Sequence, residues 1–194
     1  MGKIIKSLFF ILIFTFLALF TSNAAFSQEL SIKEATESSD IQEKDKKIEY
    51  QLPYPGLLPD SPLYFLKALR DAVVDFLISD PLKKADFYLL QADKRLNAGV
   101  YLFKIGKSKY NLAESTISKG ENYFEKAISK AIEAKQQGMN IDDISRGLRT
   151  SSRKHKEVIK ELAANADAKT KESLMALVKR AADFEKKADS LTPK

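Results

Sequence analysis

The sequence predicts an all-α protein, an elongated antiparallel bundle of about five helices. After residue 60, apolar residues recur at steps of three and four, which lines one face of a helix, and no segment alternates with the period of a strand. Capping residues, glycines and prolines separate these segments by short connections, so neighbouring helices should run antiparallel. The sustained periodicity of the last three helices also fits a coiled-coil-like C-terminal part.

Residues 1–27 have the three-part pattern of a secretory signal peptide. Lys3 and Lys6 precede an apolar run at 8–20, and small residues follow that run. The run has 13 residues, whereas a straight membrane-spanning helix needs about 20. The pattern therefore favours a signal that is cleaved over a permanent anchor.

Two cleavage positions fit the small residues, one after Ala24 and one after Ser27. The alternative is a signal that stays uncleaved and anchors the chain. Both outcomes predict an exported, extracytoplasmic protein that is secreted, periplasmic or anchored to a membrane.

Residues 28–50 are predicted to be a flexible charged linker, because seven acids and four lysines leave too little apolar surface to offset the entropy of ordering. Residues 51–194 are the predicted helical domain, within the usual length of one domain. They carry 26 basic and 19 acidic residues. A modestly basic body could bind anionic surfaces, although charge that serves only solubility explains it as well.

The first helix is expected to start at Asp60-Ser61-Pro62, after a proline-rich extended segment at 50–59. A capping side chain followed by proline suits the first turn of a helix. The apolar stripe should face inward and the charged residues outward. The expected inward residues are Leu63, Leu66, Leu69, Val73 and Phe76, and the expected outward residues are Lys67, Asp71 and Asp75.

A second helix is predicted from Asp80-Pro81 to Gly106, and a third from a cap at Ser108 to Gly138. The expected inward residues of the second are Leu82, Ala85, Leu89, Ala92, Leu96, Gly99 and Phe103. Those of the third are Ala113, Ile117, Gly120, Phe124, Ala127 and Ala131.

A fourth helix is predicted at about 141–166, and Asp167 should cap a fifth. The expected inward residues of the fourth are Ile144, Leu148, Ile159 and Leu162. Those of the fifth are Leu174, Leu177, Ala181, Phe184, Ala188 and Leu191.

Three segments together resemble a known family. Residues 57–67 read Leu-Leu-Pro-Asp-Ser-Pro-Leu-Tyr-Phe-Leu-Lys, residues 79–85 contain the second capped helix start, and residues 92–96 follow in that helix. This combination is similar to the domain-of-unknown-function family DUF5667, over about residues 50–135. The resemblance implies a helical domain of an exported or membrane-tethered bacterial protein. It implies no activity, since the family has none assigned.

Little in the sequence points to catalysis. His155 is the only histidine and cysteine is absent, and we interpret His155 as a residue at the edge of an apolar stripe rather than as a base or metal ligand. Asp142-Asp143 fits a helix start, which favours acids. Gly106-Lys107-Ser108 lacks the upstream glycine of a phosphate-binding loop. The sequence predicts no catalytic residue, no metal and no cofactor.

Two groups of residues are candidates for binding. The first is a basic face on the fourth helix, a candidate contact to an anionic surface, with a merely solvated face as the alternative. It consists of Arg146, Arg149, Arg153, Lys156 and Lys160. The second is an aromatic group that could line a ligand groove but is more simply explained by packing. It consists of Tyr54, Tyr64, Phe65, Phe87, Tyr88, Tyr101 and Phe103.

These observations favour a non-enzymatic binding or structural module of the bacterial cell envelope, whose partner is a protein or an anionic envelope polymer. One alternative is a peripheral membrane or cell-wall protein that binds through the basic face of the fourth helix. Another is a small-ligand carrier or enzyme that uses carboxylates in an interhelical pocket. Nucleic acid is not expected, because the basic face offers no aromatic residues for base stacking.

Overall fold

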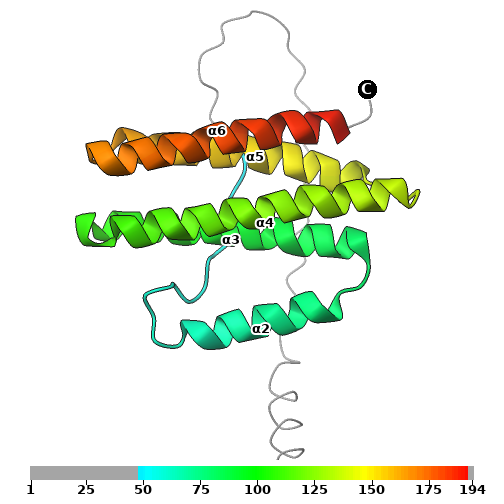
Figure 1. Cartoon of the computed structure of the whole chain (residues 1–194), viewed down its shortest axis with the longest axis horizontal. Helices are drawn as coiled ribbons and strands as arrows, with labels where there is room; N and C mark the ends of the chain where they lie inside the picture. Colours follow the sequence, from blue (N-terminus) through cyan, green and yellow to red (C-terminus); the bar gives the residue numbers. More distant parts are fainter. Residues whose placement is uncertain (1–47, 192–194) are drawn as a thin grey trace, which may run out of the picture. The chain divides into compact units, whose positions relative to one another are not determined.

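The computed structural model describes residues 48–191, and within that range the protein is all-α, as predicted (Figure 1). The signal-peptide prediction and most of the predicted linker lie outside the described residues. The helices are α2 (Tyr64–Leu77), α3 (Pro81–Ile105), α4 (Tyr110–Gln136), α5 (Asp142–Ala164) and α6 (Ala168–Leu191), with a short 3₁₀ turn, η1 (Lys107–Lys109), before α4.

Four of these helices form an antiparallel bundle. The short turns make α3 and α4 one hairpin and α5 and α6 another. The two hairpins pack together mainly through α4 against α6 and α3 against α5 (Figure 1). We refer to α3–α6 as the four-helix bundle.

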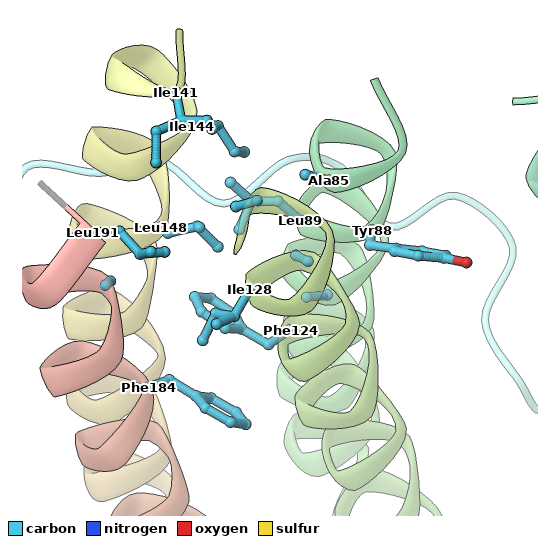
Figure 2. Close-up of a cluster of buried hydrophobic side chains, with 14 of the residues drawn as sticks. Ala85, Tyr88, Leu89, Phe124, Ile128, Ile141, Ile144, Leu148, Phe184 and Leu191 are labelled. Carbon is cyan, nitrogen blue, oxygen red and sulfur yellow. The ribbon is translucent and has the colours of Figure 1, made fainter. Parts of the chain in front are cut away.

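The core of the four-helix bundle consists of the stripes predicted from the sequence. One cluster lies around Phe124, Leu148 and Phe184, whose side chains project between α4, α5 and α6 (Figure 2). The rings of Phe124 and Phe184 stack with centroids 5.2 Å apart. A second cluster, farther along the bundle, contains Ile117 and Ile159. The inward faces predicted for these four helices are therefore confirmed.

Most of the predicted helix boundaries are also confirmed. The Asp80 carboxylate accepts a hydrogen bond from the Lys83 backbone N–H at 2.9 Å, and Asp167 accepts one from Thr170 at 3.0 Å. Gly106 ends α3 with a φ of 123°. Residues that carry a Cβ rarely adopt this conformation, whereas glycine does so readily. The prediction for Ser108 is wrong, because it lies in η1 and α4 begins after it without a side-chain cap.

The orientation predicted for the first helix is wrong. Leu69 is 61 % exposed and Phe76 85 % exposed, whereas Asp71 is only 5 % exposed. Lys67, expected to point outward, donates from Nζ to the Pro55 carbonyl at 2.5 Å. The apolar stripes of α3–α6 already satisfy one another, so α2 attaches to the rest of the domain by its charged side. It also begins at Tyr64 rather than at Pro62, after a turn.

The last residues of the predicted linker are wrongly assigned as well. The Ile48 N–H donates to the Glu157 carboxylate at 2.9 Å, and the Tyr50 hydroxyl donates to Asp93 at 2.5 Å. Farther along, Asn97 donates to the Pro53 carbonyl at 2.9 Å. The segment at 48–55 is therefore held on the four-helix bundle by hydrogen bonds and by Leu52, which packs against the second core cluster. The acids and lysines that precede this segment predicted a linker, and they do not reveal that its last residues find partners on the bundle.

Substitution of two phenylalanines tests the orientation of α2. Phe124→Ala should lower the free energy of unfolding by about 3–5 kcal/mol, because it opens a cavity in the core. Phe76→Ala should change it by no more than about 0.5 kcal/mol, because the ring is exposed. Urea unfolding followed by circular dichroism measures both. Equal losses would show that Phe76 is buried in solution.

Two glycines offer a matched test of the close approach of α3 to α4. A Cβ at Gly99 would lie 2.3 Å from Ile117 Cγ1, so Gly99→Ala should destabilise the protein by about 1–2 kcal/mol despite the better helix propensity of alanine. A Cβ at Gly147 would meet only the far end of Leu89, at 3.3 Å. Gly147→Ala should therefore be neutral or stabilising by up to about 1 kcal/mol. Thermal unfolding in which both variants shift alike would contradict the packing described.

Candidate functional site

Three ionisable side chains meet inside the four-helix bundle. His155 of α5 is bonded through Nδ1 to Glu121 Oε1 of α4 at 2.7 Å and through Nε2 to Asp93 Oδ1 of α3 at 3.0 Å. None of the three is more than 2 % exposed. We call Asp93, Glu121 and His155 the buried charged cluster.

Hydroxyl groups complete the shell around Asp93. Ser151, one turn before His155 on α5, donates to Asp93 Oδ1 at 2.5 Å, and Tyr50 donates to Oδ2 at 2.5 Å. The rings of Phe124 and His155 pack edge to face, with centroids 5.1 Å apart. In contrast, Glu121 Oε2 is buried and has no hydrogen-bond partner among the described residues. The buried charged cluster therefore joins three helices and the segment at 48–55.

The carboxylates keep His155 protonated. Burial by itself lowers the pKa of His155, but the charge of Glu121 and the hydrogen bonds and charge of Asp93 outweigh it and raise the pKa to about 9. Burial, together with the charge of Asp93, raises the pKa of the Tyr50 hydroxyl, so Tyr50 remains a neutral donor. At neutral pH, His155 thus offers two charge-assisted hydrogen bonds.

This arrangement is suited to holding helices together rather than to transferring protons. Both nitrogens of His155 bind carboxylates, and Ser151 donates to Asp93 instead of to a base. A serine nucleophile needs a neutral histidine nitrogen as its proton acceptor. Within residues 48–191, no group of three or more histidine, aspartate or glutamate side chains is arranged to hold a metal ion.

The interpretation of His155 as a mere boundary residue is wrong, since it is fully buried between two carboxylates. The sequence did contain a signal. Asp93 directly follows Ala92, and Glu121 directly follows Gly120, two positions predicted to face inward. A charged residue at the edge of each of three inward stripes is the pattern that could have indicated a buried ionic group.

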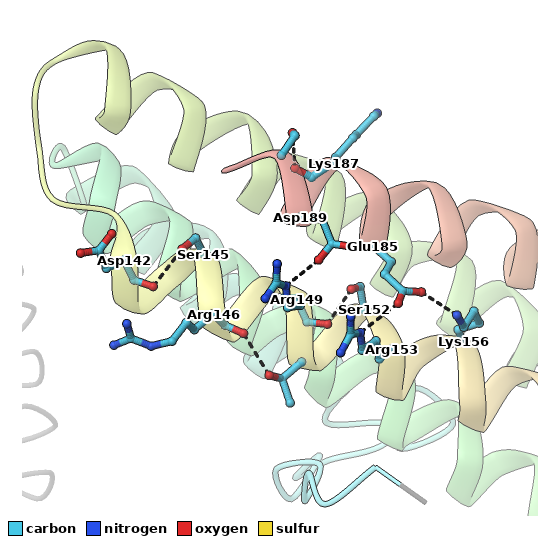
Figure 3. A network of polar contacts seen from close by, with 12 residues as sticks. Asp142, Ser145, Arg146, Arg149, Ser152, Arg153, Lys156, Glu185, Lys187 and Asp189 are labelled. Atoms are coloured by element: carbon cyan, nitrogen blue, oxygen red, sulfur yellow. Dashed lines mark hydrogen bonds and ion pairs between the residues drawn. The ribbon is translucent and has the colours of Figure 1, made fainter. Parts of the chain in front are cut away.

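The basic face predicted on the fourth helix lies along α5, beside α6. Arg149 pairs with Asp189 at 2.5 Å, and Arg153 pairs with Glu185 at 2.9 Å (Figure 3). Lys156 also reaches Glu185, at 2.5 Å. Burial raises the pKa of Glu185, but Lys156 and Arg153 outweigh that effect and lower it.

The other two residues of the basic face lie outside these contacts between helices. Arg146 pairs with Asp143 one turn earlier on α5, and Lys160 is exposed. Asp142 and Asp143 occupy the first turn of α5, as predicted. Acidic side chains thus accompany four of the five cations. The proposed contact of this face with an anionic surface stays a prediction.

The predicted aromatic group does not gather in one place. Tyr88 and Phe103 are buried in two different core clusters, and Phe103 stacks on Tyr110 with centroids 4.1 Å apart. Phe65 and Tyr54 are exposed instead. The packing interpretation holds for the buried members and is wrong for the exposed ones. Phe65 is exposed because α2 turns its apolar side outward, whereas Tyr54 lies in the segment before α2.

That apolar side is the second feature of functional interest. Six side chains of α2 are each at least half exposed and lie within an arc of about 120°, at about 3.6 residues per turn. They are Phe65, Leu66, Leu69, Val73, Phe76 and Leu77. We call these six the outward face of α2. Arg70 borders it on the helix, with a side chain that is 59 % exposed.

Ionic contacts fasten α2 at both ends. Near its start, Asp60 pairs with Lys109 at 3.2 Å. Near its end, Asp75 pairs with Lys84 of α3 at 3.4 Å. No helix pairs extensively with α2 among the described elements, and the outward face is left uncovered.

The raised pKa of His155 makes stability depend on pH. Its pKa in the folded state, about 9, exceeds the usual value near 6.5, so its contribution is complete below about pH 6.5 and is lost as the pH rises through 9. The free energy of unfolding should fall by roughly 3 kcal/mol between pH 6 and 9. Urea unfolding at a series of pH values, all below the usual pKa of tyrosine, measures this. His155→Gln is the control, because its stability should lack this dependence on pH. A flat wild-type profile would contradict the charged state.

Within the described range, no helix has the length and hydropathy of a membrane span.

Comparison with known proteins identifies the family of this chain. The comparisons with curated proteins and with solved structures find no significant match. A family model described as "Domain of unknown function (DUF5667)" matches residues 56–190, which extends the resemblance seen at 50–135 through α5 and α6. The chain therefore belongs to the DUF5667 family.

Proposed function

We propose that this chain is a non-enzymatic binding module of the bacterial cell envelope and that it contacts its partner through the outward face of α2. The observation that carries the proposal is the exposure of that face. A helix of a globular domain normally turns its apolar side toward the core, and a contiguous exposed apolar patch marks an interaction site. The signal-peptide pattern of residues 1–27 supports the envelope location.

The energy available at this face is sufficient for binding. Complete burial of a Leu or Phe side chain contributes roughly 1.5–3 kcal/mol. Six side chains that are each at least half exposed therefore offer several kcal/mol before the entropy of association is subtracted. The ionic contacts of Asp60 and Asp75 fix α2 on the domain, which lowers the ordering cost of binding.

A non-enzymatic role is further supported by the buried charged cluster. A small-ligand carrier or an enzyme that uses carboxylates in an interhelical pocket needs those groups to meet a substrate. Asp93 and Glu121 converge as such a role requires, but both are almost completely buried and His155 occupies the space between them. The ion pairs of Arg149 and Arg153 with α6 likewise favour α2 over the basic face of α5 as the contact surface.

Photo-crosslinking in the intact envelope tests this function. A photoreactive amino acid at Phe76 of the exported full chain should give discrete adducts, because the side chain is 85 % exposed in the outward face. Leu69→Ser in the same photoreactive chain should abolish these adducts, whether they form with a protein or with a lipid. A photoreactive residue at Met175, a partly exposed apolar position of α6, is the matched control. Adducts that are identical from both positions, or that Leu69→Ser leaves unchanged, would refute the role of α2.

A further inference from the structure

We propose that the outward face of α2 lies in the interfacial layer of a lipid bilayer, with the helix axis parallel to the membrane. This inference rests on the proposed binding function and names the partner. The chemistry that α2 recognises is then a surface of acyl chains and anionic headgroups, not a pocket of another protein.

The geometry of α2 matches a helix that lies on a membrane. Its 14 residues correspond to about 21 Å, whereas a helix needs about 20 residues to span the hydrocarbon core. One side carries two Phe, three Leu and one Val, and the other carries charged residues that contact the domain. A helix with Phe and Leu on one face and charge on the other inserts its apolar face a few ångströms below the headgroups.

The size of the face argues against a second copy of the chain as the occupant. A stable protein interface uses about 20–30 residues on each side, and the outward face of α2 supplies six. Its six apolar residues lie along one side of a single helix, which is a narrow strip rather than a groove. A fluid bilayer adapts to such a strip without complementary shape.

Basic residues flank the face at positions that suit anionic headgroups. Arg70 borders it directly, with a side chain that is 59 % exposed although its guanidinium also pairs with Asp71 at 2.7 Å. The Asp75–Lys84 pair places the basic start of α3, where Lys83 is exposed, beside the end of α2. The Asp60–Lys109 pair places the basic turn of η1 beside its beginning. Each lysine or arginine close to an anionic membrane contributes about 1 kcal/mol.

The sequence before the described residues brings the chain to a membrane during export. A retained apolar run at 8–20 would anchor the chain beside a bilayer, whereas a cleaved one only delivers the chain across it. Durable attachment of a peripheral protein generally requires two signals. With a retained run, the outward face of α2 is one of the two signals, and with a cleaved run the outward face and the basic residues that flank it are the two.

The absence of cysteine from the chain allows a site-specific test. Single cysteines replace Phe76 in the outward face and Lys186 on α6, an exposed control position. Each full chain is labelled with an environment-sensitive dye and mixed with phosphatidylcholine–phosphatidylglycerol vesicles that carry acyl-chain quenchers. Both chains contain residues 1–27, so insertion of that segment affects them equally. The dye at 76 should lose at least about half of its fluorescence and the dye at 186 almost none.

Variants in the labelled Phe76→Cys chain sharpen the result. Leu69→Asp should abolish the quenching, and Met175→Asp should leave it unchanged, while circular dichroism verifies that both variants are folded. Equal quenching at 76 and 186, or none at either, overturns the membrane inference.

The outcomes also separate this inference from the proposed function. One outcome is a concentration-dependent dimer that Leu69→Asp dissociates, together with no quenching of the dye at 76. This outcome would overturn the lipid contact and assign the face to a second copy of the chain. Envelope adducts specific to Phe76 without quenching would overturn the lipid contact and keep the binding function. Failure of both experiments would remove both proposals.

Discussion

The contact of His155 with Glu121 and Asp93 is the interaction on which the rest of this structure depends. It brings α3, α4 and α5 together at one level, and the axial register of the three helices places both carboxylates within hydrogen-bond distance of the imidazole. Loss of one partner from such a buried group is costly, about 3–5 kcal/mol, because a charge remains without compensation. The same aspartate holds Tyr50, so the cluster also fixes the segment that leads to α2.

A four-helix bundle closed in this way has no apolar surface reserved for a fifth helix. The stripes of α3–α6 cover one another, and α2 is left to attach by Lys67, Asp75 and the neighbouring Asp60. Its apolar residues consequently face away from the domain. The surface for which we propose a membrane contact is thus a consequence of how completely the other helices satisfy their own hydrophobic faces.

Ion pairs between neighbouring helices also contribute to the arrangement of the domain. Along the seam of α5 and α6, Arg149, Arg153 and Lys156 meet acidic residues of the neighbouring helix. These pairs are partly exposed, so each contributes modestly to stability, but together they favour the observed pairing of the two helices. At α2, by contrast, Lys84 and Lys109 pair with Asp75 and Asp60 near the two ends of the helix, and Arg70 borders the apolar face between them.

The sequence by itself determined the helical fold, the four inward stripes of α3–α6 and most helix boundaries, because periodicity and capping are local properties of consecutive residues. It also indicated the family through its capped helix starts. Tertiary structure alone decided which side of α2 is covered, since an amphipathic pattern states that two faces differ but not what each one meets. It likewise decided that His155 is buried and has a raised pKa. Both properties depend on Asp93 and Glu121, which are 62 and 34 positions away in the chain.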